Sequence, residues 1–239
     1  MGRLIKSVLR VFWAVAVIVF ALCALYPVGT VATRSAGVVS LALLWVGLVI
    51  ALWRHRWWRW LVPAVTFAIA VFLLLPGRVF SHEDLREKYV GCLRRYEGVR
   101  YVWGGENALG IDCSGLVRRG LMDALFLEGL RTFNSGLVRD AISLWWHDTT
   151  ARVLGMGEGQ TVALKIAAPQ INLLDHAALL PGDLAVTESG IHVLAYLGDQ
   201  TWIEADPGAE KVILAKVPSQ DNAWLATPVK IVRWRLFQP

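Results

Sequence analysis

The chain has 239 residues, which is enough for one ordinary domain and an additional segment. Its hydrophobic content of 56% is high for a soluble protein, and the apolar excess lies in residues 1–76. That segment holds seven of the 24 basic residues and no acidic ones, whereas residues 77–239 hold 17 basic and 19 acidic residues. The basic overall balance therefore does not indicate a nucleic-acid-binding protein, and we expect no nucleic-acid partner.

Three apolar runs fill this first segment, at residues 11–28, 37–53 and 60–75. Each is close to the roughly 20 residues that a bilayer-spanning helix needs, so we predict a membrane anchor of three transmembrane helices in a lipid bilayer. The basic residues lie beyond the ends of the runs, and those before residue 11 and in the 54–59 loop indicate cytoplasmic segments. Three crossings then place residues 77–239 on the opposite side of the membrane.

The sequence leaves alternatives to this anchor open. The first run has features of a cleavable signal peptide, although its apolar stretch is long. Cys23 suggests lipid attachment, but Leu22 stands where such sites have a small residue. A topology with two membrane helices would leave the rest of the chain in the cytoplasm. The third run is nevertheless apolar throughout, and Pro63 lies near its start, where a helix tolerates proline.

Residues 77–239 begin with segments that have helical features. Ser81 is a good N-cap for a helix that extends to about Tyr96. A second helix should begin at Cys113 and reach Phe126 or Leu127. These two helices would form the first layer of a domain.

The middle of the chain is less distinct. A further helical stretch is expected over residues 135–150, and residues 161–168 fit either a strand or a helix. This additional material could line a substrate cleft, rest on the membrane or only pack on the domain.

The last third of the chain has the alternation and β-branched residues of strands. The expected strands cover residues 183–187, 191–197, 201–205, 211–215 and 229–237. Gly198-Asp199 and Pro207-Gly208 supply turns between them. A group of helices followed by an antiparallel sheet predicts an α+β domain over residues 77–239.

One cysteine stands where a helix is expected to begin. Cys113 follows a glycine-rich turn and Asp112, which is a plausible N-cap. Amide N–H groups at a helix N-terminus stabilise a thiolate, which is the nucleophilic form of cysteine. His192 lies 79 positions later in an alternating, strand-like segment. A cysteine at a helix start with a distant histidine on a strand is typical of papain-like thiol hydrolases.

Residues 83–235 resemble the NlpC/P60 domain of cell-wall peptidases, because four sequence pieces occur in that family's order. The pieces are Tyr101-x-Trp-Gly-Gly, Asp112-Cys113-Ser114-Gly115-Leu116-Val117, Pro181-Gly182-Asp183-Leu184, and His192-Val193 followed by Tyr196-Leu197-Gly198. The resemblance implies a papain-like fold in which the nucleophile helix packs against the sheet that carries the histidine.

The resemblance also implies roles for individual residues. Cys113 would be the nucleophile and His192 the general base, with Glu204 as the third, orienting residue. The family more often has His, Asn or Gln at that third position. Asp112 and Ser114 match positions that hold the substrate's free amine in some members, and Tyr101 would be a cleft residue.

Hairpin geometry gives an independent test of Glu204. With a three-residue loop at 198–200, Leu197 would face Thr201, and Glu204 would be a diagonal neighbour of His192 on one face of the sheet. A two- or four-residue loop would place the two side chains on opposite faces. A carboxylate beside the imidazole would fix its tautomer and raise its basicity.

The expected activity is hydrolysis of amide bonds in the peptide stems of peptidoglycan. The predicted topology places this cysteine peptidase at the bacterial inner membrane, with its catalytic domain on the periplasmic or extracellular side. Two alternatives remain: thiol-dependent acyl transfer or lipid deacylation, which related folds perform, and a degenerate domain that serves as a membrane partner protein.

Two further features bear on the chemistry. Cys92 also lies in the exported part, and a Cys92–Cys113 disulfide would consume the nucleophile, although a buried free thiol in a helix is the simpler interpretation. His82, His147 and His176 lack the spacing of metal ligands. No metal or other cofactor is therefore expected.

Overall fold

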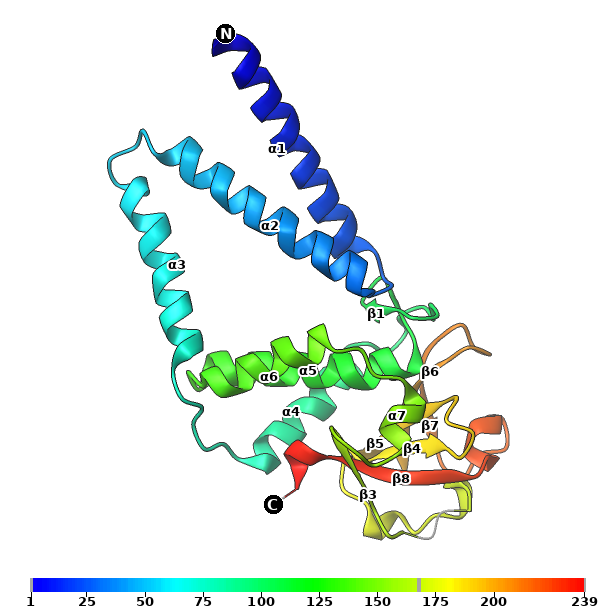
Figure 1. Ribbon diagram of the computed structural model, residues 1–239. Helices are drawn as coiled ribbons and strands as arrows, with labels where there is room; N and C mark the ends of the chain where they lie inside the picture. Colours follow the sequence, from blue (N-terminus) through cyan, green and yellow to red (C-terminus); the bar gives the residue numbers. More distant parts are fainter. Residues whose placement is uncertain (1, 167–168, 239) are drawn as a thin grey trace.

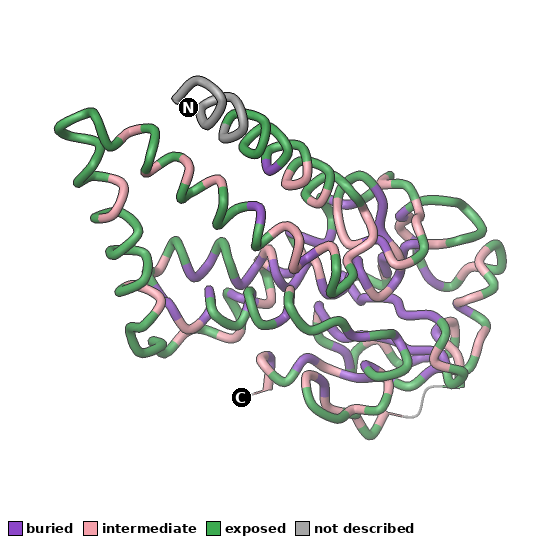
Figure 2. The backbone as a smooth tube through the Cα atoms, turned by 45° about the horizontal axis from the view of Figure 1, so that its top comes forward, coloured by how far each residue is buried: buried purple, intermediate pink, exposed green. Residues whose placement is uncertain are grey.

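The computed structural model describes residues 2–166 and 169–238, with side chains from residue 10 onward. The chain begins with α1 (Gly2–Leu25), α2 (Val31–Leu52) and α3 (Trp58–Leu74). These three helices extend from one side of the remaining structure (Figure 1). Most of their described apolar side chains are exposed, in contrast to the buried interior of the rest (Figure 2).

Among the described residues, α2 is the helix that is both long enough and apolar enough to cross a bilayer. The described part of α1 from Arg10, and α3, are shorter apolar helices. Helix α2 begins at Val31, six residues before the predicted run, because Thr30 and Thr33 form a capping box. Its first turn therefore lies close to the rest of the chain and carries Arg34.

Four helices form the layer beside the sheet: α4 (His82–Arg94), α5 (Cys113–Arg131), α6 (Ser135–Trp146) and α7 (Ala151–Gly155). The side chain of Ser81 accepts a hydrogen bond from the Asp84 N–H at 3.1 Å, so the predicted N-cap of α4 is confirmed. The helix predicted over 135–150 ends earlier, at Trp146, and a separate short helix, α7, begins just after this range because Thr150 caps it as a new start.

A six-stranded antiparallel sheet has the order β3-β8-β4-β5-β6-β7. The strands are β3 (Thr161–Ala163), β4 (Leu184–Thr187), β5 (Val193–Gly198), β6 (Thr201–Asp206), β7 (Lys211–Lys216) and β8 (Val229–Trp234). The ambiguous 161–168 segment thus begins as a strand, and residues 167–168 of it lie outside the described part. A small sheet of β1 (Glu106–Asn107) and β2 (Gly110–Ile111) was not predicted.

Strand alternation divides the buried side chains between two cores. Val193, Ala195 and Ile203 face the core shared with α4 and α5. Leu194 and Trp202 face a second core, covered by the segments at 171–179 and 223–226. This arrangement confirms the predicted α+β class, with the helix that begins at Cys113 packed on an antiparallel sheet.

Candidate active site

Cys113 is the first residue of α5, and its neighbours hold the helix start in place. Asp112 is the N-cap, as predicted, and its Oδ1 accepts hydrogen bonds from the Gly115 N–H at 2.6 Å and the Ser114 hydroxyl at 3.0 Å. Its Oδ2 accepts from the Gly104 N–H at 2.8 Å. Asp112 therefore ties the glycine-rich turn to the nucleophile helix.

The two glycines before the helix serve different steric needs. Gly104 has a φ of +72°, a left-handed conformation that favours glycine. Gly105 accepts a hydrogen bond from the Asp112 N–H at 3.0 Å. A Cβ on Gly115 would overlap the Gly105 carbonyl, so the turn and the first turn of α5 approach as closely as their backbones allow.

His192 precedes β5 and lies in a buried polar setting. Its backbone N–H donates to the Thr187 hydroxyl at 3.1 Å, and its ring Nε2 lies 2.5 Å from Oε2 of Glu204. The side chains of His192 and Glu204 are 2% and 0% exposed. Because Nε2 is engaged by Glu204, Nδ1 is the nitrogen left for the Cys113 thiol.

The electrostatics of the pocket favour a charged imidazole. Burial alone would lower the pKa of His192, but hydrogen bonds to Cys113 and Glu204, together with the charges of those groups, raise it from 6.5 to about 9. The structure therefore brings together the three residues predicted as catalytic, with the histidine as the shared partner.

The route by which Glu204 reaches His192 differs from the predicted one. Ala195 pairs with Ile203 as the expected register requires, but Gly198, not Leu197, pairs with Thr201. The loop has two residues, Asp199 and Gln200, both with positive φ. A bulge between Tyr196 and Gly198 supplies the extra residue. The expectation that a two-residue loop would separate the side chains was therefore wrong.

Two supporting residues escaped the sequence analysis. Trp224 stacks on His192 with a centroid separation of 4.1 Å and an interplanar angle of 19°. The Asn222 amide donates to Oε1 of Glu204, the oxygen that His192 does not use. Both residues lie at the short 3₁₀ helix Ala223–Ala226, whose sequence carries no signal that points to the site. They fix the imidazole plane and the carboxylate.

A cleft of about 480 Å³ opens at Cys113. Tyr101, Asp112 and Ser114, the predicted substrate-binding residues, all line it. Burial, with the nearby Cys113 and Asp112, raises the pKa of Tyr101 to about 12, so its phenol is a hydrogen-bond donor at neutral pH. Residues 148–152 also line the cleft, and the additional segment between α5 and the sheet thus forms one of its walls.

Two other residues that the sequence singled out, Cys92 and Asp183, have structural roles away from the cleft. Cys92 is a free, buried thiol in α4, so the Cys92–Cys113 disulfide is absent from the described cysteines. Asp183 of the Pro-Gly-Asp-Leu piece accepts two hydrogen bonds from Arg233, at 2.6 and 2.8 Å. That ion pair joins the start of β4 to β8 and supports the sheet rather than the cleft.

The fold and the site define a papain-like α+β domain in which a cysteine lines a cleft and a histidine–carboxylate pair is buried beneath the surface. The chain belongs to the NlpC/P60 family, which matches residues 98–233. No curated protein matches the chain closely enough to count as a relative.

Solved structures of the same family resemble the fold at low sequence identity. The peptidoglycan hydrolase RipB from Mycobacterium tuberculosis is 20% identical, with a TM-score of 0.43 over 90% of this chain and 94% of that one. NlpC1 from Trichomonas vaginalis is 19% identical, with a TM-score of 0.42 over 66% of this chain and 46% of its own. NlpC2 from the same organism is 20% identical, with a TM-score of 0.41 over 68% and 50%. The chain therefore spans about half the length of the two T. vaginalis proteins.

Proposed function

We propose that this protein is a cysteine peptidase that hydrolyses amide bonds in the peptide stems of peptidoglycan, and that it is anchored in the membrane. Membership of the NlpC/P60 family supports a hydrolase of cell-wall peptides. The observation that carries the cysteine mechanism is the placement of Cys113 on the cleft at the start of α5, with Glu204 held 2.5 Å from the imidazole of His192, whose pKa Cys113 also raises.

The proposed reaction has two halves, acylation of Cys113 and hydrolysis of the resulting thioester, and Cys113, His192 and Glu204 act in both. The Cys113 thiolate attacks the scissile carbonyl carbon, and backbone N–H groups at the start of α5, including that of Cys113, stabilise the oxyanion. The His192 imidazolium gives its proton to the leaving amine as the C–N bond breaks. Water, deprotonated by the neutral imidazole, then attacks the thioester and releases the carboxylate and the thiolate. Glu204 holds the tautomer throughout.

The walls of the cleft suit a polar peptide. Asp112 and Ser114 offer oxygen acceptors beside the nucleophile, which fits a free amine on the substrate, and the Tyr101 phenol can donate to a carbonyl. RipB is described as a peptidoglycan hydrolase, which agrees with this substrate class. Amide hydrolysis needs no cofactor in this scheme.

Digestion of purified peptidoglycan by the full-length chain tests the proposal. We expect soluble peptide fragments, and mass spectrometry of the fragments identifies the bond that is cut. Transfer of an acyl group to an added amine instead of water would favour the acyltransferase alternative. A chain that releases no fragment and transfers no acyl group would support the non-catalytic alternative.

The N-terminal helices support the membrane part of the proposal. Most of their described apolar side chains are exposed, and the described α2 is long enough to span a bilayer. In the proposed topology, α1, α2 and α3 all cross the bacterial inner membrane. The C-terminal end of α1, the N-terminal end of α2 and the C-terminal end of α3 lie toward the catalytic domain (Figure 1), which fits a domain held at the outer surface.

We expect a reporter that works only in the periplasm to be active when it is fused after Pro239. Three crossings from a cytoplasmic N-terminus would carry that end outward. The same reporter fused in the loop between α2 and α3, after Arg56, is the matched control and should be silent. An active cytoplasmic reporter after Pro239 would contradict the three-crossing topology.

A further inference from the structure

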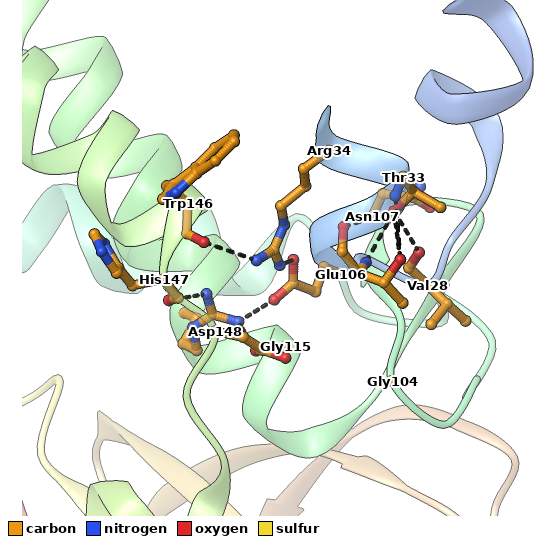
Figure 3. Close-up of polar contacts among 12 residues, drawn as sticks. Val28, Thr33, Arg34, Gly104, Glu106, Asn107, Gly115, Trp146, His147 and Asp148 are labelled. Atoms are coloured by element: carbon orange, nitrogen blue, oxygen red, sulfur yellow. Dashed lines mark hydrogen bonds and ion pairs between the residues drawn. The ribbon is translucent and has the colours of Figure 1, made fainter. Parts of the chain in front are cut away.

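One charged side chain of the N-terminal helices is buried against the catalytic domain. Arg34, in the first turn of α2, is 4% exposed. Its Nη2 donates to Oε2 of Glu106 at 2.5 Å, and its Nη1 donates to the carbonyl of Trp146 at 3.2 Å (Figure 3). An arginine at this depth needs such partners, because an unpaired buried charge is costly.

The carboxylate that Arg34 binds belongs to a wall of the cleft. Glu106 lines the cleft at Cys113, and its other oxygen accepts from Arg118, which is 1% exposed. Arg118 also donates to Asp148 at 2.7 Å, and Asp148 lines the same cleft. Two guanidinium groups and two carboxylates thus alternate from α2 to the cleft, with no net charge.

Backbone contacts join the same two parts of the chain. The Glu106 N–H donates to the Pro27 carbonyl at 2.9 Å, and Val28 forms an isolated bridge with Gly105. Gly29 has no room for a side chain, since a Cβ there would lie 2.6 Å from Oε2 of Glu106. The loop between α1 and α2 is therefore fitted closely to the turn before the nucleophile helix.

The glycine turn at residues 104–105 connects the Arg34–Glu106 contact to the start of α5. Gly105, which bridges to Val28, accepts the Asp112 N–H, and Gly104 donates to the Asp112 carboxylate. The Arg34 contact on Glu106 consequently lies one residue along the backbone from the group that binds the N-cap of α5. Without Arg34, Glu106 and Asp148 would share Arg118 and leave an excess negative charge at the cleft wall.

We propose that Arg34 is a positioning residue for the cleft: the α2 helix completes the substrate cleft by fixing and neutralising Glu106. The catalytic domain then has its full affinity for substrate only when it is docked on its own N-terminal helices. Where this concerns peptide substrates it rests on the proposed function.

The kinetic test compares Arg34→Met, Arg34→Lys and the control Arg54→Met, all as full-length chains in detergent micelles. Arg54 is exposed at the far end of α2, in the turn toward α3. For Arg34→Met we expect KM for soluble stem peptides to rise about tenfold with kcat changed less than about threefold, because ground-state positioning is lost. Arg34→Lys should recover part of the effect, and Arg54→Met should match the parent. The proposal would be overturned if the KM of Arg34→Met equalled that of the parent chain, whether or not kcat fell.

A second measurement does not depend on any substrate. Alkylation of Cys113 by the anion iodoacetate and by neutral iodoacetamide is followed by mass spectrometry. The excess negative charge in Arg34→Met should lower the iodoacetate-to-iodoacetamide rate ratio about threefold. Adding Glu106→Gln to Arg34→Met removes that charge and should restore the ratio.

The two measurements separate the two proposals. A lowered ratio that Glu106→Gln restores, in a chain that releases no peptide, would refute the peptidase function and keep the role of Arg34. An unchanged ratio in Arg34→Met would overturn the role of Arg34 whatever the activity.

Discussion

Replacement of Cys113 by alanine is expected to reduce the release of peptide fragments from purified peptidoglycan by at least about 10³-fold. The substitution removes the only atom that forms the acyl-enzyme, whereas the cleft, His192 and Glu204 remain. Residual turnover would then depend on binding and the oxyanion-stabilising N–H groups. Because the remaining rate is low, peptide release is followed by chromatography over several hours.

Cys92→Ala is the matched control for this loss. Cys92 is a buried thiol in α4, and burial raises its pKa, which leaves it as an unreactive thiol. Its replacement should leave kcat unchanged and lower the free energy of unfolding by about 1 kcal/mol, because a small core side chain is shortened. Equal activity of Cys113→Ala and the parent chain would refute the cysteine mechanism.

Replacement of Glu204 by glutamine should lower kcat by about 10²- to 10⁴-fold. Glutamine keeps the size of the side chain and can still accept a hydrogen bond, but it removes the negative charge beside His192. Burial of the ring, which lowers its pKa, would then be opposed by Cys113 without the help of Glu204. The imidazolium would be less stable, and so would the thiolate that pairs with it.

The same substitution should also shift the pH dependence of the rate, in a direction set by the pKa of His192. The raised pKa of His192, about 9, means that the imidazolium that protonates the leaving amine persists to that pH in the parent chain. The rate should therefore fall as pH rises through about 9, and in Glu204→Gln the fall should begin nearer the ordinary value of 6.5. Stability contributed by the same shift is fully present below 6.5 and is lost as pH rises to 9.

To test this prediction, kcat is measured against pH for the parent chain, Glu204→Gln and Glu188→Gln. Glu188 is an exposed residue just after β4, so its replacement controls for the loss of one carboxylate. An alkaline limb that stays at the same pH in all three chains would exclude Glu204 as the partner that sets the histidine's basicity.

Local rules were sufficient for much of the fold. The strand at 201–205 was expected from alternation and lies at Thr201–Asp206, and the N-caps Ser81 and Asp112 followed from their side-chain chemistry. These features depend on neighbours within a few residues, which the sequence displays directly. The β5–β6 bulge lies beside residues with positive φ, Gly198 and Asp199, and the alternation of side chains along the two strands did not predict it.

The support of the site depends on contacts between distant segments. Asn222 approaches Glu204 and Trp224 covers His192 only because the chain returns across the sheet after β7. The burial of Arg34 against Glu106 joins residues 72 positions apart and needs the docking of α2. No periodicity or spacing encodes such pairs, so the sequence indicated the three central groups without the residues that hold them.

The place of β8 in the sheet constrains the timing of assembly. Residues 229–234, the last of the described strands along the chain, lie between β3 and β4 rather than at an edge. A growing chain that has not yet released these residues leaves β3 without its partner and exposes one edge of β4. Asn222 and Trp224 also arrive just before this strand. If the proposed topology and function hold, a chain that has not yet delivered residues 222–234 would lack the two side chains that hold His192 and Glu204, and it would have no organised base for catalysis.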